Sequence, residues 1–308
     1  MLLRGRPPIP PWGALPPVKR MAWDGRTLPV TWQGAPEIMG VLNLTPDSFS
    51  DGGELLSPRG VLQRDPLLRR AETFVEAGAA YLDLGAESTR PGAKGLPEGE
   101  EWARIQEALE LLAPRFDVKL SVDTSTPEIL RQAPALGAAL LNDVRALQRP
   151  GALAAAAAAS ASVCLMHMQG DPASMQAAPH YDDVVGEVLA FLQARMGEAE
   201  AAGIARDRIL LDPGFGFGKT LAHNLSLFRA LPRFVALGVP VLIGVSRKRM
   251  LGALTGREAP KARVVAGAVL AAEAARHGVA IIRTHDVAET RDALAMVQAL
   301  DGPTKDAR

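Results

Sequence analysis

Residues 80–124 read AYLDLGAESTRPGAKGLPEGEEWARIQEALELLAPRFDVKLSVDT and contain the pattern that decides the fold class. The apolar runs at 80–86 and 119–124 are typical of buried strands, and the apolar periodicity at 98–113 is that of a helix. A helical connection of this length allows the two strands to run parallel. The stretch therefore predicts one β–α–β unit.

The same alternation continues on both sides of this unit. It predicts strands at 37–44, 80–86, 119–124, 140–144, 162–167, 209–214, 241–246 and 279–285. Helical patterns lie at 66–78, 98–113, 127–136, 147–160, 182–202, 260–277 and 286–300. Eight such units indicate an α/β protein that closes as a (β/α)8 TIM barrel. An open doubly wound sheet is the alternative, but it usually has fewer units and a glycine-rich turn after its first strand.

The remaining segments are short additions to one domain. Residues 1–16 are rich in proline and are expected to form a flexible tail, and 302–308 a second one. Two short runs around Asp24-Gly25 predict an N-terminal β-hairpin extension at 18–32. We therefore expect a single barrel domain over 17–301.

Composition excludes several classes of protein. The chain has 308 residues, of which 48% are hydrophobic and 22% charged, so it can bury a large core and is not disordered. Lys+Arg and Asp+Glu both number 34, and this balance points to no nucleic-acid or membrane partner. The single cysteine, Cys164, excludes an intrachain disulfide. With no signal-peptide pattern at the N-terminus, a cytoplasmic location is expected.

Polar side chains occur near the C-terminal end of every predicted strand. They are Asn43, Asp83, Glu87, Asp123, Asn142, His167, Asp212, Ser246, Lys248, Arg283 and His285. Any one of them could be a helix cap or part of a hydrogen-bonded layer. In a barrel, however, all eight C-terminal ends meet at one mouth, where active sites lie. Their recurrence on all eight strands favours a functional site.

The chemistry of these residues suggests two subsites. Asp123, Asn142, Asp212 and Lys248 offer both acceptors and donors, which suits a flat heterocycle with several N–H groups and a carbonyl. A second set, Asn43, Arg90, Arg283 and His285, suits an anion near the positive end of the helix that follows Asp286.

Three loops have unusual compositions. TPDSFSDGG at 45–53 and STRPGAKGLPEG at 88–99 are dense in glycine, proline and polar turn residues, and we interpret them as lids over the mouth. The third, DPGFGFGKT at 212–220, resembles a phosphate-binding loop, but Pro213 stands where a Walker A motif needs glycine. We interpret its glycines as allowing close approach of a ligand.

Taken together, the motifs resemble those of the dihydropteroate synthase family, the folate-pathway enzymes that sulfonamides inhibit. The matching blocks are IMGVLNLTPDSFSDGG (38–53), YLDLGAESTRPGA (81–93), SVDTSTPEIL (121–130), LLNDV (140–144), LMHMQGDPASMQ (165–176), LLDPGFGFGKT (210–220), IGVSRKRMLG (243–252) and IIRTHDV (281–287). The resemblance implies a pterin-binding barrel. It also implies a transferase that condenses 7,8-dihydro-6-hydroxymethylpterin pyrophosphate with p-aminobenzoate, giving 7,8-dihydropteroate and pyrophosphate.

The resemblance also implies roles for particular residues. The pterin pocket would contain Asp123, Asn142, Met166, Asp212, Phe217, Gly244, Lys248 and Arg283. Pyrophosphate would contact Asn43, Thr89, Arg90, Arg283 and His285, with Mg²⁺ held at Asn43. The p-aminobenzoate site would contain Phe49, Arg90, Pro91, Phe217, Ser246 and Lys248, and the catalytic residues would be Asp47, Lys248, Arg283 and His285. Arg249 departs from the pattern, because many members carry a small hydroxyl residue there.

Further expectations concern mechanism and assembly. Two carboxylates face the pterin and no base is poised for the amine, so we expect pyrophosphate to leave, with help from Mg²⁺, before the amine attacks. The resemblance implies a homodimer formed through barrel helices. Alternatives are a methyltransferase on the same barrel, which would lack the two lid motifs, and a non-catalytic pterin-binding paralogue, which would have lost site residues.

Overall fold

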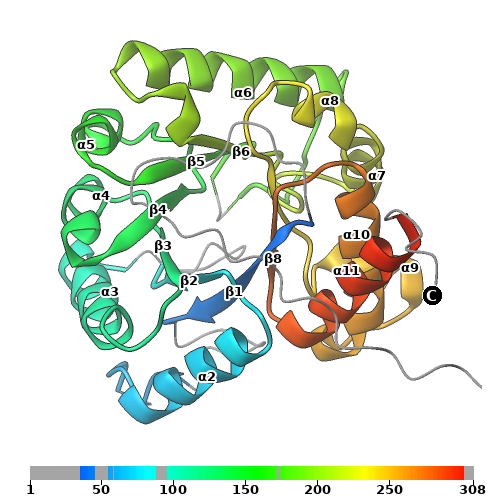
Figure 1. Ribbon diagram of the computed structural model, residues 1–308. Coiled ribbons are helices and arrows are strands. Elements are labelled where there is room, and N and C mark those ends of the chain that lie inside the picture. Colours follow the sequence, from blue (N-terminus) through cyan, green and yellow to red (C-terminus); the bar gives the residue numbers. More distant parts are fainter. Residues whose placement is uncertain (1–34, 46–54, 58, 88–95, 172–173, 302–308) are drawn as a thin grey trace, which may run out of the picture.

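The computed structural model describes residues 35–45, 55–57, 59–87, 96–171 and 174–301 (Figure 1). Within this part, eight parallel strands form one sheet in the order β6-β5-β4-β3-β2-β1-β8-β7. The strands are β1 (Glu37–Asn43), β2 (Tyr81–Gly85), β3 (Lys119–Asp123), β4 (Ala138–Asp143), β5 (Ser162–Met166), β6 (Ile209–Asp212), β7 (Leu242–Gly244) and β8 (Ile281–Thr284). The eight predicted strands are thus confirmed, with ends shifted by up to two residues.

The two outer strands of this order, β6 and β7, come together and close the barrel. The amide of Leu211 in β6 donates to the carbonyl of Pro240 at 3.0 Å, and Leu211 pairs in parallel with Val241, just before β7. Figure 1 looks into the resulting ring of strands, with the helices around it. The (β/α)8 TIM barrel is therefore confirmed and the open sheet is excluded.

The helices form the outer layer of the barrel. They are α2 (Arg64–Glu76), α3 (Glu98–Leu112), α4 (Pro127–Gln132), α5 (Ala152–Ala158), α6 (Val184–Ala201), α7 (Leu221–Arg229), α8 (Leu231–Val235), α9 (Arg249–Thr255), α10 (Val264–Arg276) and α11 (Val287–Asp301). Short 3₁₀ turns occupy Ala133–Leu136, Arg206–Arg208 and Pro260–Arg263. Helices α7, α8 and α9 were not predicted individually, because each is short and its apolar pattern covers less than three turns.

Alternation along the strands creates two apolar layers. One fills the space between strands and helices, and the other is a small cluster inside the barrel made of Met39, Tyr81, Leu140, Cys164, Leu210, Leu242, Ala280 and Ile281. Cys164 is a buried free thiol. Successive inward positions are two residues apart, so the next inward residues toward the strand ends are Asp83, Asn142, Asp212, Gly244 and Arg283. The interior therefore changes from apolar to polar toward the mouth.

Some predictions lie outside the described residues. These are the hairpin at 18–32, the tails 1–16 and 302–308, and most of both lid loops. No helix in the part of the chain that the structure describes is long and apolar enough to cross a membrane.

Candidate active site

Strand register brings the predicted polar residues to one level of the barrel. Asp123 at the end of β3 pairs with Asn142 of β4, and Met166 of β5 pairs with Asp212 of β6. On the other side, Gly244 of β7 pairs with Arg283 of β8. Because these positions share the inward orientation, the register brings Asp123, Asn142 and Asp212 of the predicted heterocycle site to one level, whereas Lys248 reaches it from the loop after β7.

Arg283 crosses the mouth and joins two carboxylates. Its Nε donates to Asp83 Oδ2 at 2.6 Å and its Nη2 donates to Asp123 Oδ2 at 3.0 Å. Gly244 leaves room for this path, since a β-carbon there would lie 3.7 Å from the Cβ of Arg283. Asn142 Nδ2 also approaches Asp83 Oδ2, at 3.4 Å. One wall of the site is thus a charged network centred on a planar guanidinium.

The carboxylates of this site carry more charge than their partners neutralise. Burial raises the pKa of Asp123 to about 7, with Arg283 lowering it and Asp83 raising it. Burial likewise raises the pKa of Asp212, although Lys248 and the amide of Gly214, which donates to Asp212 Oδ1 at 2.7 Å, oppose this. Such carboxylates gain from a ligand that donates hydrogen bonds to them.

Lys248 lies on the opposite wall, at the end of the loop between β7 and α9, and its side chain contacts the loop between β6 and α7. Its ammonium donates to the carbonyl of Phe215 and lies 4.7 Å from the centre of the Phe217 ring. Gly216 is directly beneath the side chain, since a β-carbon there would lie 3.2 Å from Lys248 Cδ. Burial lowers the pKa of Lys248 to about 8, against the opposing effect of Asp212. Lys248 and Phe217, which the sequence analysis assigns to the same pocket, are therefore in contact.

The turn that carries Ser246 and Lys248 has a strained backbone. Arg247 has a φ of +58°, which is unusual for a residue other than glycine. Its guanidinium pairs with Asp286, and its carbonyl accepts from Arg263 Nη1 at 2.8 Å. These contacts hold the turn so that Lys248 reaches the mouth.

His285 lies beside this turn. Its Nδ1 is 3.1 Å from Ser246 Oγ, and its amide donates to the same hydroxyl at 3.2 Å. Arg283 instead points into the barrel toward Asp83 and Asp123. β8 ends at Thr284, so His285 lies beyond the strand and its direction is not fixed by the strand alternation.

Asp83 is a site residue that the sequence did not single out. It is fully buried, contacts Arg283 and Asn142, and its Oδ1 has no hydrogen-bond partner among the described residues. Its signal in the sequence was its place two residues after Tyr81, on the inward side of β2. The sequence places it among the strand-end polar residues but indicates no role for it.

The other predicted residues divide into two groups. Asn43 lies at the end of β1 beside Gly85, and Met166 is buried at the end of β5. Arg249 is exposed at the first position of α9. Asp47, Phe49, Thr89, Arg90 and Pro91 lie outside the described residues.

The glycines of 212–220 have a packing role that the sequence did not indicate. A β-carbon at Gly214 would overlap the carbonyl oxygen of His167, and one at Gly218 would lie 2.5 Å from that of Gln169. Gly214, Gly216 and Gly218 all have positive φ. Two of the three glycines are thus required because the loop packs on the backbone that follows β5.

Comparisons with known proteins give a consistent result. The family described as pterin binding enzyme matches residues 39–285. Dihydropteroate synthase of Escherichia coli strain K12 is 47% identical over 264 residues, covering 86% of this chain and 91% of that protein.

Two solved structures are similar over most of their length. A Yersinia pestis dihydropteroate synthase in a sulfonamide drug complex has a TM-score of 0.85 and 46% identity, covering 92% of this chain and 99% of that one. The Xanthomonas albilineans enzyme with 4-aminobenzoic acid has a TM-score of 0.80 and 48% identity, covering 87% and 94%.

Proposed function

The chain belongs to the pterin-binding enzyme family, as a transferase of the dihydropteroate synthase type, and we propose how its residues carry out that reaction. The 47% identity to a dihydropteroate synthase, over most of both chains, favours this reaction over the methyltransferase and non-catalytic alternatives. The reaction joins 7,8-dihydro-6-hydroxymethylpterin pyrophosphate to p-aminobenzoate. The observation that carries the proposal is the ring of Asp83, Asp123, Asn142, Asp212 and Lys248 around the guanidinium of Arg283.

The pterin is held between the two walls of this ring. Asp123 and Asp212 accept hydrogen bonds from the N–H edge of the heterocycle, and this contact favours their ionised forms despite burial. Asn142 supplies both a donor and an acceptor, and Lys248 faces the ring carbonyl. Phe217 and Met166 provide apolar contact. The raised pKa of Asp123 and the lowered pKa of Lys248 support this assignment, because both groups lack full compensation without a ligand.

Pyrophosphate is held on the side of β1 and β8. Arg283 has five N–H donors and uses two of them on Asp83 and Asp123, so donors remain for an anion. His285, Thr89 and Arg90 complete the anion site in this proposal. When these groups balance the charge of the leaving pyrophosphate, the pterin–oxygen bond breaks more easily.

Mg²⁺ fits the donor set at this position. The described residues contain no group of three His, Cys, Asp or Glu side chains able to hold a metal ion. Mg²⁺ usually keeps several waters and binds one or two protein oxygens together with substrate phosphates, so Asn43 and pyrophosphate are sufficient ligands. When bound there, the ion would supply charge neutralisation for the leaving group.

The amine then attacks the methylene carbon of the pterin. Asp123 and Asp212 stabilise positive charge on the conjugated ring, and Asp47 either adds to this stabilisation or assists loss of the amine proton. Phe49, Arg90, Pro91, Phe217, Ser246 and Lys248 position p-aminobenzoate. Support for departure before attack is that the described residues at the mouth are cation-stabilising carboxylates, and His285 already contacts Ser246.

Two experiments test the reaction and its timing. Purified protein with both substrates and Mg²⁺ should form dihydropteroate, detected by chromatography, and no product would refute the proposal. In single turnovers at saturation, ring-substituted aminobenzoates should react at rates that depend little on amine basicity. A steep increase with basicity would indicate concerted displacement and make Asp47 the candidate base.

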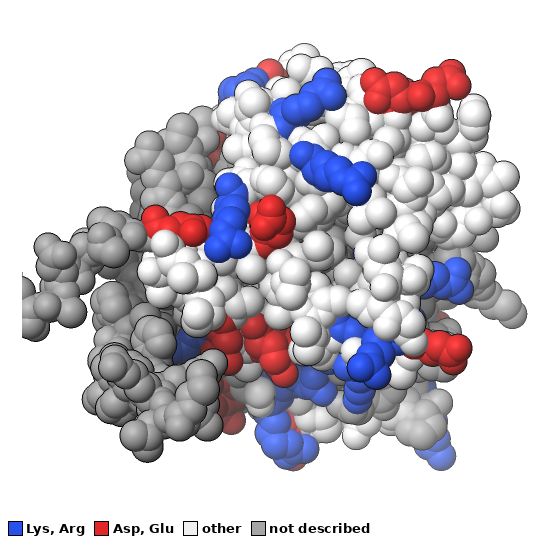
Figure 2. Space-filling model, turned by 90° about the vertical axis from the view of Figure 1, so that its right-hand side faces the viewer, with Lys and Arg blue, Asp and Glu red and all other residues white. Residues whose placement is uncertain are grey.

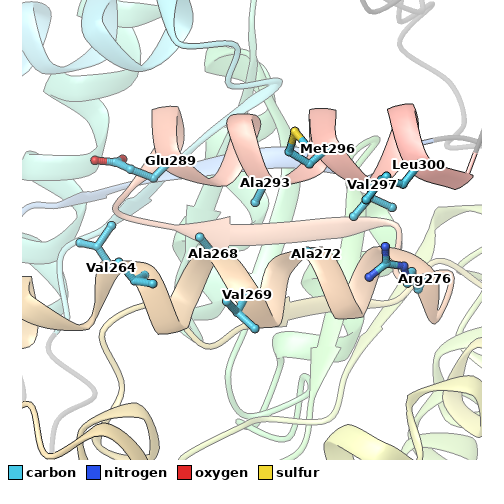
Figure 3. A pocket seen from close by; sticks show the side chains of 11 residues that line it. Val264, Ala268, Val269, Ala272, Arg276, Glu289, Ala293, Met296, Val297 and Leu300 are labelled. Atoms are coloured by element: carbon cyan, nitrogen blue, oxygen red, sulfur yellow. The ribbon is translucent and has the colours of Figure 1, made fainter. Parts of the chain in front are cut away.

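We further propose that the protein is a homodimer through α10 and α11. These helices lie side by side and enclose a shallow groove of about 370 Å³ lined mostly by apolar side chains, with Arg276 and Glu289 also in its lining (Figure 3). Val265, Val269, Met296 and Leu300 are exposed there. Figure 2 shows that much of the face over these helices carries no charged side chains. A second copy presenting the same apolar surface would cover it.

The dimer is tested by light scattering after size-exclusion chromatography. Val269→Glu should shift the mass toward that of one chain. Val61→Glu is the matched control, since Val61 and Val269 are both 60% exposed but Val61 lies away from α10 and α11. A wild-type protein of monomer mass would refute this proposal.

A cytoplasmic location is also proposed, supported by the free thiol of Cys164.

A further inference from the structure

Side chains hold every carbonyl group of the glycine-rich loop from Gly214 to Gly218. Lys248 donates to the carbonyl of Phe215, Gln176 to that of Gly216, and Tyr181 to that of Gly218 at 2.9 Å. The carbonyls of Gly214 and Phe217 both accept from Lys219, at 2.9 and 3.0 Å. A loop between a strand and a helix is thus tied down along its whole length.

Lys219 is the residue with the most contacts in this arrangement. Its side chain enters the protein, and the residue is only 3% exposed. Besides the two loop carbonyls, Nζ lies 2.9 Å from His167 Nδ1 and 3.4 Å from the carbonyl oxygen of His167. The three protons of an ammonium group match the three close acceptors. Within the described residues, Lys219 forms no ion pair with a carboxylate.

His167 provides an acceptor that does not compete for the proton. Burial, followed by the charge of Lys219, lowers the pKa of His167 to about 3. The ring is therefore neutral at working pH, and its Nδ1 lone pair faces the ammonium. The ring also packs edge-on against Phe191 of α6, with centroids 4.9 Å apart. Lys219 consequently links the loop after β6 to a fixed point at the end of β5.

Burying the ammonium of Lys219 destabilises the folded protein, because the charge loses its hydration. Burial lowers the pKa of Lys219 to about 7, which reflects that cost. An apolar side chain of the same length would fill the space without it. The Lys219 ammonium nevertheless donates to the carbonyls of Gly214 and Phe217. These carbonyls flank that of Phe215, to which Lys248 donates, so Lys219 fixes the backbone on both sides of it.

We propose that Lys219 is a positioning residue for the synthase reaction: it clamps the loop at 214–218 to His167 so that the Phe215 carbonyl and the Phe217 ring hold Lys248 in place. The inference rests on the proposed role of Lys248 in pterin binding. Lys219 itself lies behind the loop and touches no substrate. Its effect reaches the site through the peptide that supports Lys248.

The test compares Lys219→Met with Lys119→Met. Lys119 is a partly buried lysine at the opposite end of the barrel, where it pairs with Glu37. For Lys219→Met we expect the dissociation constant of the pterin pyrophosphate to rise at least about tenfold, because small displacements of a positioning group reduce function by one to two orders of magnitude. The KM for p-aminobenzoate at saturating pterin should change much less.

Two further readouts separate positioning from a general loss of stability. Hydrogen exchange of the unliganded protein should become faster at the amides of residues 214–219 in Lys219→Met and stay unchanged there in Lys119→Met. The alkaline limit of pterin binding, set by Lys248 among Asp212, Arg283 and Asp123, should move to higher pH in Lys219→Met. A released loop exposes Lys248 to water, and loss of the like charge of Lys219 acts in the same direction, so both raise the pKa of Lys248 toward the ordinary value.

Each outcome decides the question. Wild-type affinity in Lys219→Met, or equal losses in both variants, would overturn the proposal. If Lys219→Met does not fold, Lys219→Gln is judged by the same criteria, and failure of both to fold would assign Lys219 to folding and overturn it. If the wild-type enzyme itself does not bind the pterin, the proposed function fails, while loop exchange in the unliganded protein still tests the clamp.

Discussion

The two ends of the barrel interior both contain charged groups, but they are partnered differently. At the N-terminal end, Lys119 lies 2.9 Å from both carboxylate oxygens of Glu37, 3.2 Å from the hydroxyl of Tyr81 and 4.5 Å from the centre of its ring. One cation meets one carboxylate there. At the mouth, Asp83, Asp123 and Asp212 face Arg283 and Lys248.

The consequences for ionisation differ in the same way. At the mouth, burial raises the pKa of Asp123 to about 7 and lowers that of Lys248 to about 8, and one oxygen of Asp83 is buried without a partner among the described residues. At the N-terminal end of the barrel, which we call the closed end, Lys119 and Glu37 satisfy each other's charge. The mouth is incomplete without a ligand, so its stability and its function are expected to oppose each other.

The largest effect is expected for Arg283→Met, which removes the cation shared by Asp83 and Asp123. Breaking a buried ion pair costs about 3–5 kcal/mol of unfolding free energy. The loss, measured by urea unfolding, should be greater at pH 8 than at pH 5, since Asp123 can take up a proton at low pH. Equal losses of unfolding free energy at the two pH values would mean that the charges at the mouth are balanced as fully as those at the N-terminal end.

At the closed end, Lys119→Met should lower the unfolding free energy by about 1.5–3 kcal/mol, because hydrogen bonds to charged groups are lost. The affinity for the pterin pyrophosphate should stay as in the wild type. Urea unfolding and calorimetric titration measure the two quantities. A loss of affinity would show that the two ends are coupled.

Asp212→Asn should lower affinity and not stability, the reverse of Lys119→Met. It keeps the shape but removes a charged acceptor, so pterin binding should weaken by about 1.5–3 kcal/mol in calorimetric titration. The unfolding free energy should not fall, since burial disfavours the charge that the substitution removes. Unchanged affinity would place Asp212 away from the ligand.

The smallest effect concerns the pH dependence of stability. The folded-state pKa of Asp123 is raised, so the folded protein holds this proton more tightly and loses stability as pH rises from about 4 to about 7. Asp123→Asn removes this dependence and should gain on the order of 1 kcal/mol relative to the wild type between pH 5 and pH 8. Thermal unfolding across that range measures it. Parallel profiles of the two proteins would refute the raised pKa.

The sequence was informative about the site wherever strand alternation governs side-chain direction. Asp123, Asn142, Asp212 and Arg283 lie at strand ends, and all four meet as predicted. It was less informative beyond the strands. His285 follows the last residue of β8 and turns to Ser246, and the partner of Lys219 is His167, 52 positions away. Such contacts depend on loop paths that no periodicity encodes.

By itself the sequence determined the barrel, its strand order and the polar character of its mouth, because each follows from local alternation and from one repeated β–α unit. Only the tertiary structure decided which charges are compensated. Partners such as Asp83 and Arg283 are 200 positions apart, and their burial depends on how all the strands close together. Charge compensation is therefore a property of the assembled barrel and not of any one segment.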